Sequence, residues 1–206
     1  MTVRVSGMGE DFRITIPSET PFIKLRRFIE KNIDWIKNQL LKRREEVLIQ
    51  AGTILPIHGK SRVLTKSRQL QGPFALDETY LVIPDTNFSM PSYVKKILIG
   101  IALEYFEREC SLYAKRLGVS YKKLSIKDTK SRWGSCSSDG NLMFSCRLIL
   151  APLKVSSYVA AHEVAHLVFL NHSREFWKTV GRVFPNYQEP RRWLKKNGSI
   201  LHSFVF

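Results

Sequence analysis

The pattern of hydrophobic and polar positions predicts strands and one long helix in the first part of the chain. Alternation at residues 3–5 and 12–16 predicts two short strands. Ser18 or Thr20 then caps a helix whose apolar residues recur at spacings of three and four. That stripe consists of Phe22, Leu25, Ile29, Ile33, Ile36 and Leu40. Short apolar runs separated by glycines and prolines predict further strands at residues 53–57, 62–65 and 80–83.

The second half is predicted to be mainly helical, with a small amount of sheet. A helix begins near Pro91 and ends at Gly118, because glycine commonly follows the last turn of a helix. The remaining predictions are strands at 124–127 and 141–148 around a turn at 132–140, and helices at 155–170, from Ser173 to before Pro185, and at 189–196. A helix–strand–strand–helix order indicates an α+β fold and not a doubly wound parallel sheet.

Composition is that of a soluble globular protein. The chain has 206 residues, of which 44% are hydrophobic and 25% charged. No apolar run has the length of a signal peptide core or of a membrane span, so a cytoplasmic protein without a membrane anchor is expected. Cys110, Cys136 and Cys146 form no CxxC pair, which argues against a disulfide framework and against a cysteine zinc site.

The formal net charge of +15 changes this picture in one respect. A positive field of this size attracts polyanions such as nucleic acid or nucleotides. The basic residues are spread along the chain and form no polybasic tail. A solvated basic surface and a dedicated face for nucleic acid or a nucleotide therefore both remain open.

An HExxH motif, His162-Glu163-Val164-Ala165-His166, lies inside the helix predicted at 155–170. Histidines at positions i and i+4 lie on one face of a helix, so both imidazoles can reach one metal ion. Glu163 projects about 100° around the helix and can reach a water on that ion without becoming a ligand. Zn²⁺ acidifies such a water, and Glu163 would act as the general base. The motif predicts a zinc-dependent hydrolase; the alternative is a pair of core histidines with Glu163 at the surface.

A catalytic zinc ion usually has a third protein ligand, and His172 is the first candidate. The resulting spacing, HExxHxxxxxH, is that of the long metzincin motif, although Phe169 stands where that motif has glycine. Asn171 is expected to end the helix instead, in the left-handed conformation, and to return His172 to the metal. Glu175 and Glu189 are the alternative third ligands.

Four segments between Arg132 and Trp177 carry a family resemblance: RWGSC (132–136), NLMFSCRLILAP (141–152), YVAAHEVAHL (158–167) and NHSREFW (171–177). Together they resemble the YgjP-like, or DUF45, metallopeptidase family, which is related to the SprT-like and WLM zinc peptidases. The resemblance implies a zincin-like core, made of a long helix, a small β-sheet and the HExxH helix, in a domain at 91–206. Residues 1–90 are then an N-terminal β-rich region with one long helix.

The resemblance also implies a set of functional residues. The zinc ligands are His162, His166 and His172, the general base is Glu163, and the turn at 132–136 lies near the site. The sequence departs from the family pattern twice. Ser145 stands where an asparagine is expected, and Ser157 where an acidic residue is expected before the tyrosine.

Other residues are not part of the predicted ligand set. Arg132 and Trp133 are candidate substrate-binding residues; the alternative is that Trp133 is a core aromatic and Arg132 a satisfied turn residue. Tyr187 is a candidate for an oxyanion-stabilising hydroxyl. His58 and His202 have no partner in the sequence and are predicted to be surface residues.

Three functions are compatible with these residues. The first is a zinc metallopeptidase, with an extended peptide lying beside the strand at 141–148. The second is a metal-dependent hydrolase of nucleotides or other phosphate esters, which the positive charge would suit. The third is a peptidase that acts on DNA- or RNA-bound proteins.

Overall fold

The computed structural model describes residues 1–5, 12–41 and 45–206. These residues form two compact units, Met1–Glu46 and Val47–Phe206. The predicted division into domains at residue 90 falls inside the second unit and stays a prediction. Within the described part of the chain, no helix is long and apolar enough to cross a membrane.

The first unit combines a β-ribbon with one helix. Strands β1 (Thr2–Val5) and β2 (Phe12–Thr15) pair antiparallel, and α1 (Phe22–Leu41) follows them, as predicted. Ile36 is buried, but Phe22 and Ile33 are 75% and 38% exposed. The predicted helix is confirmed, and these two residues of its apolar stripe are exposed. The side chain of Leu40 lies outside the described residues.

The second unit begins with a four-stranded sheet in the order β4-β5-β7-β6. Its strands are β4 (Ile54–Ile57), β5 (Lys60–Ser67), β6 (Ala75–Leu76) and β7 (Tyr80–Pro84). β5 and β7 run parallel, and the outer strands pair antiparallel to them. Alternate residues of the three longer strands are buried in the hydrophobic core. The predicted strands are thus confirmed, and the two-residue β6 is an addition.

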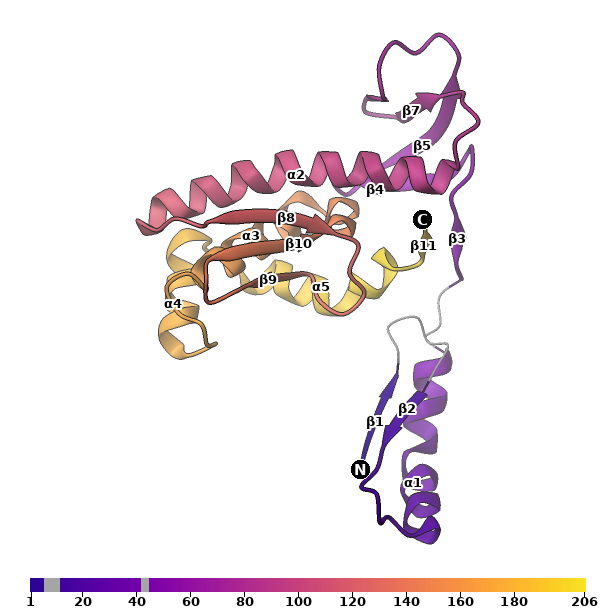
Figure 1. Cartoon of the computed structure of the whole chain (residues 1–206), viewed down its shortest axis with the longest axis vertical. Helices are drawn as coiled ribbons and strands as arrows, with labels where there is room; N and C mark the ends of the chain where they lie inside the picture. The colour runs from indigo at the N-terminus through magenta and orange to yellow at the C-terminus, as the bar shows by residue number, and fades with distance from the viewer. Residues whose placement is uncertain (6–11, 42–44) are drawn as a thin grey trace. The chain divides into compact units, whose positions relative to one another are not determined.

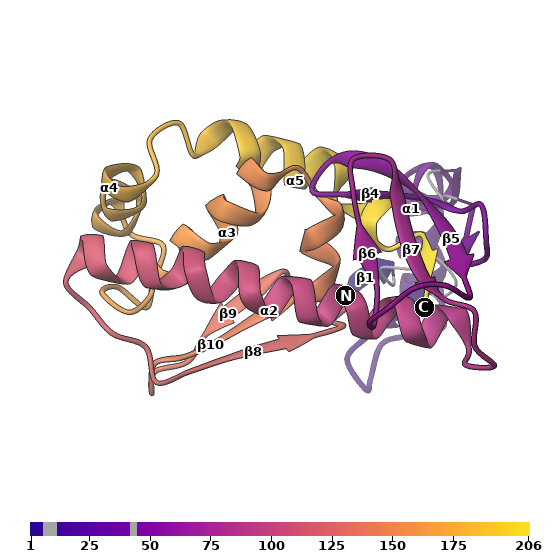
Figure 2. The same cartoon turned by 90° about the horizontal axis from the view of Figure 1, so that it is seen from above.

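Helix α2 (Met90–Leu117) is the long helix of this unit (Figures 1 and 2). It ends as predicted at Gly118, whose φ of 68° lies in the left-handed region where glycine carries no Cβ penalty. Its buried residues include Val94, Leu98 and Phe106, and the Phe106 ring stacks on Phe144 at 4.2 Å. Through this contact the helix packs against the sheet that follows it in the chain, and both contribute to one hydrophobic core.

A three-stranded sheet follows, with β10 (Asn141–Ser145) between β8 (Lys123–Lys127) and β9 (Gly134–Cys136). β8 pairs parallel with β10, and β9 antiparallel. The predicted strand at 141–148 is wrong beyond Ser145, because Cys146–Leu150 form a fully buried 3₁₀ helix, η1. β9 lies within the turn predicted at 132–140. The sequence did not predict this strand, because three residues that include a glycine show no alternating pattern.

Three helices complete the unit: α3 (Leu153–Ala165), α4 (Arg174–Val183) and α5 (Gln188–Leu201). α3 ends five residues before the predicted boundary. α5 extends past the predicted end through Gly198, where a Cβ would lie 3.0 Å from the Trp133 ring. Contact with the tryptophan, and not helix termination, therefore accounts for this glycine.

The C-terminus is fixed by a buried arginine. β11 (Phe204–Val205) pairs with β3 (Val47–Leu48), and Arg147 donates hydrogen bonds of 2.9 Å to the carbonyls of Leu201 and Phe204. The same guanidinium pairs with Asp128 at 2.6 Å. Five α-helices and several small sheets thus make up the described part of the chain, and the predicted α+β class is confirmed.

Candidate metal centre

Three imidazoles form the only cluster of potential metal ligands that the described residues contain. One ring nitrogen from each of His162, His166 and His172 lies within 4.8 Å of the others. The Nε2 atoms of His162 and His172 are 3.1 Å apart. Nitrogens about 2 Å from one tetrahedral zinc ion stand about 3.3 Å apart. The three imidazoles are thus a donor set that suits zinc, and the distance between His162 and His172 is close to this value.

Two helices bring these residues together. His162 lies in the last turn of α3, and the chain continues from His166 through tight turns in which Leu167 and Val168 donate to carbonyls three residues earlier. This tightening replaces the predicted left-handed Asn171, since His58 and Asn186 are the described non-glycine residues with positive φ. Asn171 instead accepts a hydrogen bond from the backbone of Ser173 at 3.2 Å, just after His172.

The protonation of the histidines suits a metal ligand. Burial, followed by the charges of His166 and His172, lowers the pKa of His162 to about 3, and burial also lowers that of His166. Both rings are therefore neutral at pH 7, as ligation requires. The carbonyl of Phe169 lies 2.9 Å from Nδ1 of His166 and places the proton there, which leaves Nε2 free. Nδ1 of His162 is buried, and no residue that the structure describes forms a hydrogen bond with it.

A buried phenylalanine supports all three rings. Phe176 is fully buried, and its ring centroid lies 4.4 Å from that of His166 and 4.9 Å from those of His162 and His172. The helix that carries it starts as predicted at Ser173, whose hydroxyl accepts the Phe176 backbone N–H. Phe176 is therefore part of the hydrophobic core.

Glu163 is buried beside this cluster and lies against strand β9. Its side chain is 6% exposed, and burial raises its pKa to about 8 against the opposing charge of Arg132. A Cβ at Gly134 would lie 2.6 Å from both Cγ and Oε1 of Glu163. The glycine of the RWGSC segment therefore provides the space that the carboxylate occupies. The alternative with Glu163 at the surface is wrong.

The backbone of β9 is open on the side away from β10. Trp133 and Ser137 bond to Ser145 and Asn141, respectively, across the sheet. Backbone groups alternate in direction along a strand, so Gly134 and Cys136 direct their N–H and C=O groups toward the outer edge. β10 has neighbours on both sides. The expectation that a peptide lies beside residues 141–148 is therefore wrong, because β10 has no open edge.

The remaining candidates differ in their surroundings. The Trp133 ring stacks on His202 at 4.7 Å and packs on α5, which agrees with a core aromatic. Glu175 and Glu189 form ion pairs with Lys178 and Lys154 and do not join the histidine cluster. As substrate-binding residues, Arg132, Trp133 and Tyr187 stay predictions.

Tyr187 reaches the cluster through a stack of side chains. Its ring stacks on Trp177 at 5.2 Å, and the Trp177 ring lies 5.6 Å from His162 and 5.7 Å from His172. The guanidinium of Arg191 lies 4.3 Å above the Trp177 ring. Sequence reasoning missed Arg191, because its proximity depends on how α5 packs beside α4.

The two departures from the family pattern have different surroundings. The hydroxyl of Ser157 donates to Glu109 of α2 at 2.5 Å and lies 2.6 Å from the hydroxyl of Tyr113. The facing helix thus supplies the carboxylate that the local sequence lacks. Ser145 is fully buried, and its hydroxyl has no partner in the described structure.

Comparison with known proteins identifies the family. The profile of the YgjP-like metallopeptidase domain matches residues 1–197, so the chain belongs to this family and is a metallopeptidase. A solved structure, the metallopeptidase zymogen abylysin of Pyrococcus abyssi, is 24% identical, with a TM-score of 0.40 over 44% of this chain and 93% of that one. No curated protein matches the chain.

Proposed function

We propose that this metallopeptidase is a zinc enzyme in which His162, His166 and His172 hold the ion and Glu163 is the general base. The observation that carries the proposal is the set of three imidazoles, with ligand atoms within 4.8 Å of one another, beside a buried carboxylate. When bound, zinc would acidify a water and polarise the scissile carbonyl.

The protein's own part in the reaction is positioning and proton transfer. Phe176 and the Phe169 carbonyl hold the imidazoles in fixed orientations, which keeps their Nε2 atoms directed at one point. Glu163 takes a proton from the attacking water on an oxygen of its carboxylate. It then gives that proton to the departing amine nitrogen. Its position next to His162 in α3, with its carboxylate buried, supports this role.

The substrate is an extended peptide that pairs with the outer edge of β9. The open N–H and C=O groups of Gly134 and Cys136 support this arrangement, since they can bond a peptide backbone without reading its sequence. Gly134 touches Glu163, so a peptide on this edge lies beside the general base. A hollow of about 890 Å³ next to His166, between the end of α2 and the β9–β10 turn, has room for a substrate side chain.

The test compares wild-type protein with Glu163→Gln after zinc analysis of both. We expect about one zinc per chain in each and cleavage of an unfolded protein by the wild type alone. Glu107→Gln, the same change on the exposed face of α2, is the matched control and should cleave normally.

A parallel incubation with nucleoside triphosphate separates the substrate classes. Hydrolysis of the triphosphate that depends on Glu163, without any peptide cleavage, would contradict the peptidase assignment. Full peptidase activity in Glu163→Gln would contradict the role of the general base.

A further inference from the structure

A second site lies in the turn between β4 and β5, away from the histidine cluster. The turn residues His58 and Gly59 have φ angles of 54° and 75°, the signature of a type I′ hairpin. Asparagine or glycine is usual at the first position, and a histidine there costs on the order of 1 kcal/mol. The His58 N–H donates to the Ile149 carbonyl at 2.6 Å, and a Cβ on Gly59 would lie 2.9 Å from Pro152. These two contacts hold the turn against the segment that precedes α3.

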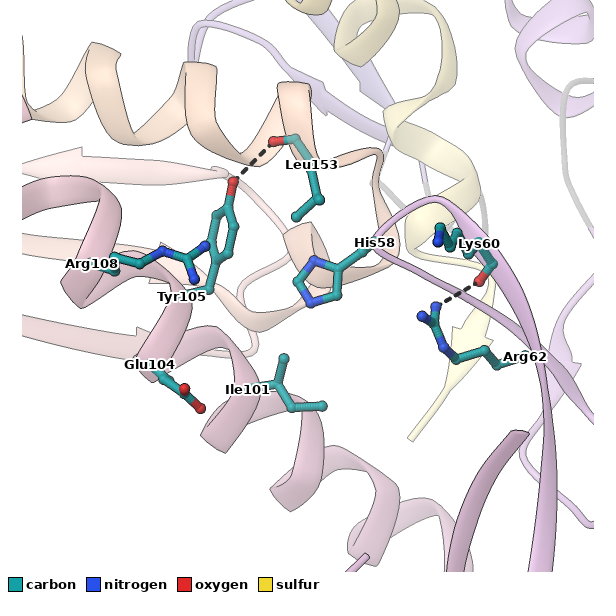
Figure 3. A pocket seen from close by; sticks show the side chains of 8 residues that line it. All are labelled: His58, Lys60, Arg62, Ile101, Glu104, Tyr105, Arg108 and Leu153. Atoms are coloured by element: carbon teal, nitrogen blue, oxygen red, sulfur yellow. Dashed lines mark hydrogen bonds between the residues drawn. The ribbon is translucent and has the colours of Figure 1, made fainter. Parts of the chain in front are cut away.

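The turn and α2 line a cavity of about 340 Å³ that is open to solvent, a size that suits a small molecule. One face of α2 forms a wall, because its lining residues have helical spacing: Ile101, Glu104, Tyr105 and Arg108. Figure 3 shows His58 projecting from the turn toward this wall, with Tyr105 on one side and Arg62 on the other. Leu153, the first residue of α3, completes the lining.

The cavity is lined by more positive than negative charge. Lys60, Arg62 and Arg108 contribute cations, and Glu104 is the acidic residue of the lining. Arg62 is only 7% exposed and donates to the carbonyls of Asp77 and Ile57 without forming an ion pair in the described structure. It also donates to the Lys60 carbonyl at 3.3 Å, so its hydrogen bonds go to carbonyls and none goes to a carboxylate of the described structure. A buried cation without a directly bonded anion is costly in a protein interior.

The neighbouring carboxylates are engaged elsewhere. Asp77 accepts hydrogen bonds from the backbones of Thr79 and Tyr80, and Glu78 pairs with Lys60 at 2.6 Å. Arg62 therefore has no ion pair in the described structure. Arg108 is 70% exposed, pairs with Glu109 at 3.7 Å, and its guanidinium lies 5.4 Å above the Tyr105 ring.

His58 completes the polar lining. Its Nδ1 atom is buried and has no hydrogen-bond partner among the described residues, although buried imidazole nitrogens are normally satisfied. Burial, followed by the charges of Arg62 and Arg108, lowers the pKa of His58. The neutral ring can donate one hydrogen bond and accept another. The prediction that His58 is an ordinary surface residue is therefore wrong, because its Nδ1 atom is buried.

We propose that this cavity binds a small organic dianion, with a phosphate or dicarboxylate head held by Arg62, Arg108 and His58 and its apolar part against Ile101 and Leu153. Guanidinium groups match the geometry of both kinds of oxyanion. The site is independent of the zinc proposal: α3 separates Leu153 from His162 by about 14 Å.

The experiment is calorimetric titration of the full-length protein with phenyl phosphate and with succinate. The protein carries His162→Ala and His166→Ala, which prevents an anion from binding to metal. We expect saturable one-to-one binding of at least one ligand, and the stronger ligand identifies the head group. No saturable binding of either ligand would overturn the proposal.

Three further variants locate the site. Arg108→Gln and His58→Asn should each weaken binding about tenfold or more, as loss of a charged hydrogen bond does. Asparagine is chosen because it tolerates the left-handed turn. Lys115→Gln removes the same charge from an exposed position of α2 outside the cavity and should bind as the parent does. Equal weakening by Lys115→Gln and Arg108→Gln would show a general charge effect and reject the site.

Discussion

Gly134→Ala tests whether β9 positions the general base. The backbone of Gly134 has ordinary φ, so alanine is unstrained there and the substitution acts through the new Cβ alone. That atom would lie 2.6 Å from Cγ and Oε1 of Glu163, whereas ordinary contacts begin at 3.4 Å. Glu163 must therefore retreat by roughly 1 Å, a misplacement that typically costs about 100-fold in rate.

The cost in stability should be smaller, because the obstacle is one side chain and not backbone. We expect a loss of about 1–2 kcal/mol in the free energy of unfolding, with zinc content unchanged. The assay is cleavage of an unfolded protein, measured beside chemical denaturation. Gly100→Ala is the matched control: its Cβ meets nothing within 4 Å, and this helical position should gain about 0.5–1 kcal/mol at full activity.

A double variant makes the reasoning refutable. If Gly134 acts through Glu163, adding Gly134→Ala to Glu163→Gln should lower the residual activity little further, because the two residues act as a unit. Independent, multiplicative losses would refute the mechanism. Wild-type activity in Gly134→Ala alone would show that β9 does not fix the carboxylate.

Three further predictions concern the metal and the core. His172→Ala should reduce zinc affinity by more than the roughly 10–100-fold that loss of an outer-shell partner costs, measured by competition with a chromophoric chelator; His202→Ala, a histidine outside the cluster, should leave it unchanged. Arg147→Met should lower the free energy of unfolding by about 3 kcal/mol, because it leaves the carbonyls of Leu201 and Phe204 without this donor and Asp128 with Lys95 alone, and denaturation that matches wild type would contradict this. Burial raises the pKa of Asp128, but hydrogen bonds from Arg147 and Lys95 outweigh it and lower the pKa below the ordinary value of 3.8. The ionised carboxylate therefore adds to the free energy of unfolding above about pH 4, and this addition is lost as the pH falls through the folded-state pKa. Acid titration of unfolding should show a step that Asp128→Asn lacks.

Much of the local structure was readable from the sequence. The long helix ending at Gly118 and the cap at Ser173 were predicted because caps depend on neighbouring residues alone. The same holds for two histidines four residues apart on one helix, which share a face in any tertiary context. Family membership also followed from ordered local segments and is confirmed.

Only the tertiary structure decided how distant segments meet. β9 was missed because a three-residue edge strand is defined by its partner, and its contact with Glu163 depends on how α3 packs against the sheet. Glu109 of α2 supplies the carboxylate beside Ser157, and Arg191 of α5 lies above the ring of Trp177. The sequence by itself determined the helices, the family and the histidine pair, since these depend on short-range spacing. Packing decided the space for Glu163 at Gly134, the open edge of β9 and the cationic cavity beside α2. Each of these is formed by residues far apart in the chain, and no periodic pattern in the sequence shows that such residues meet.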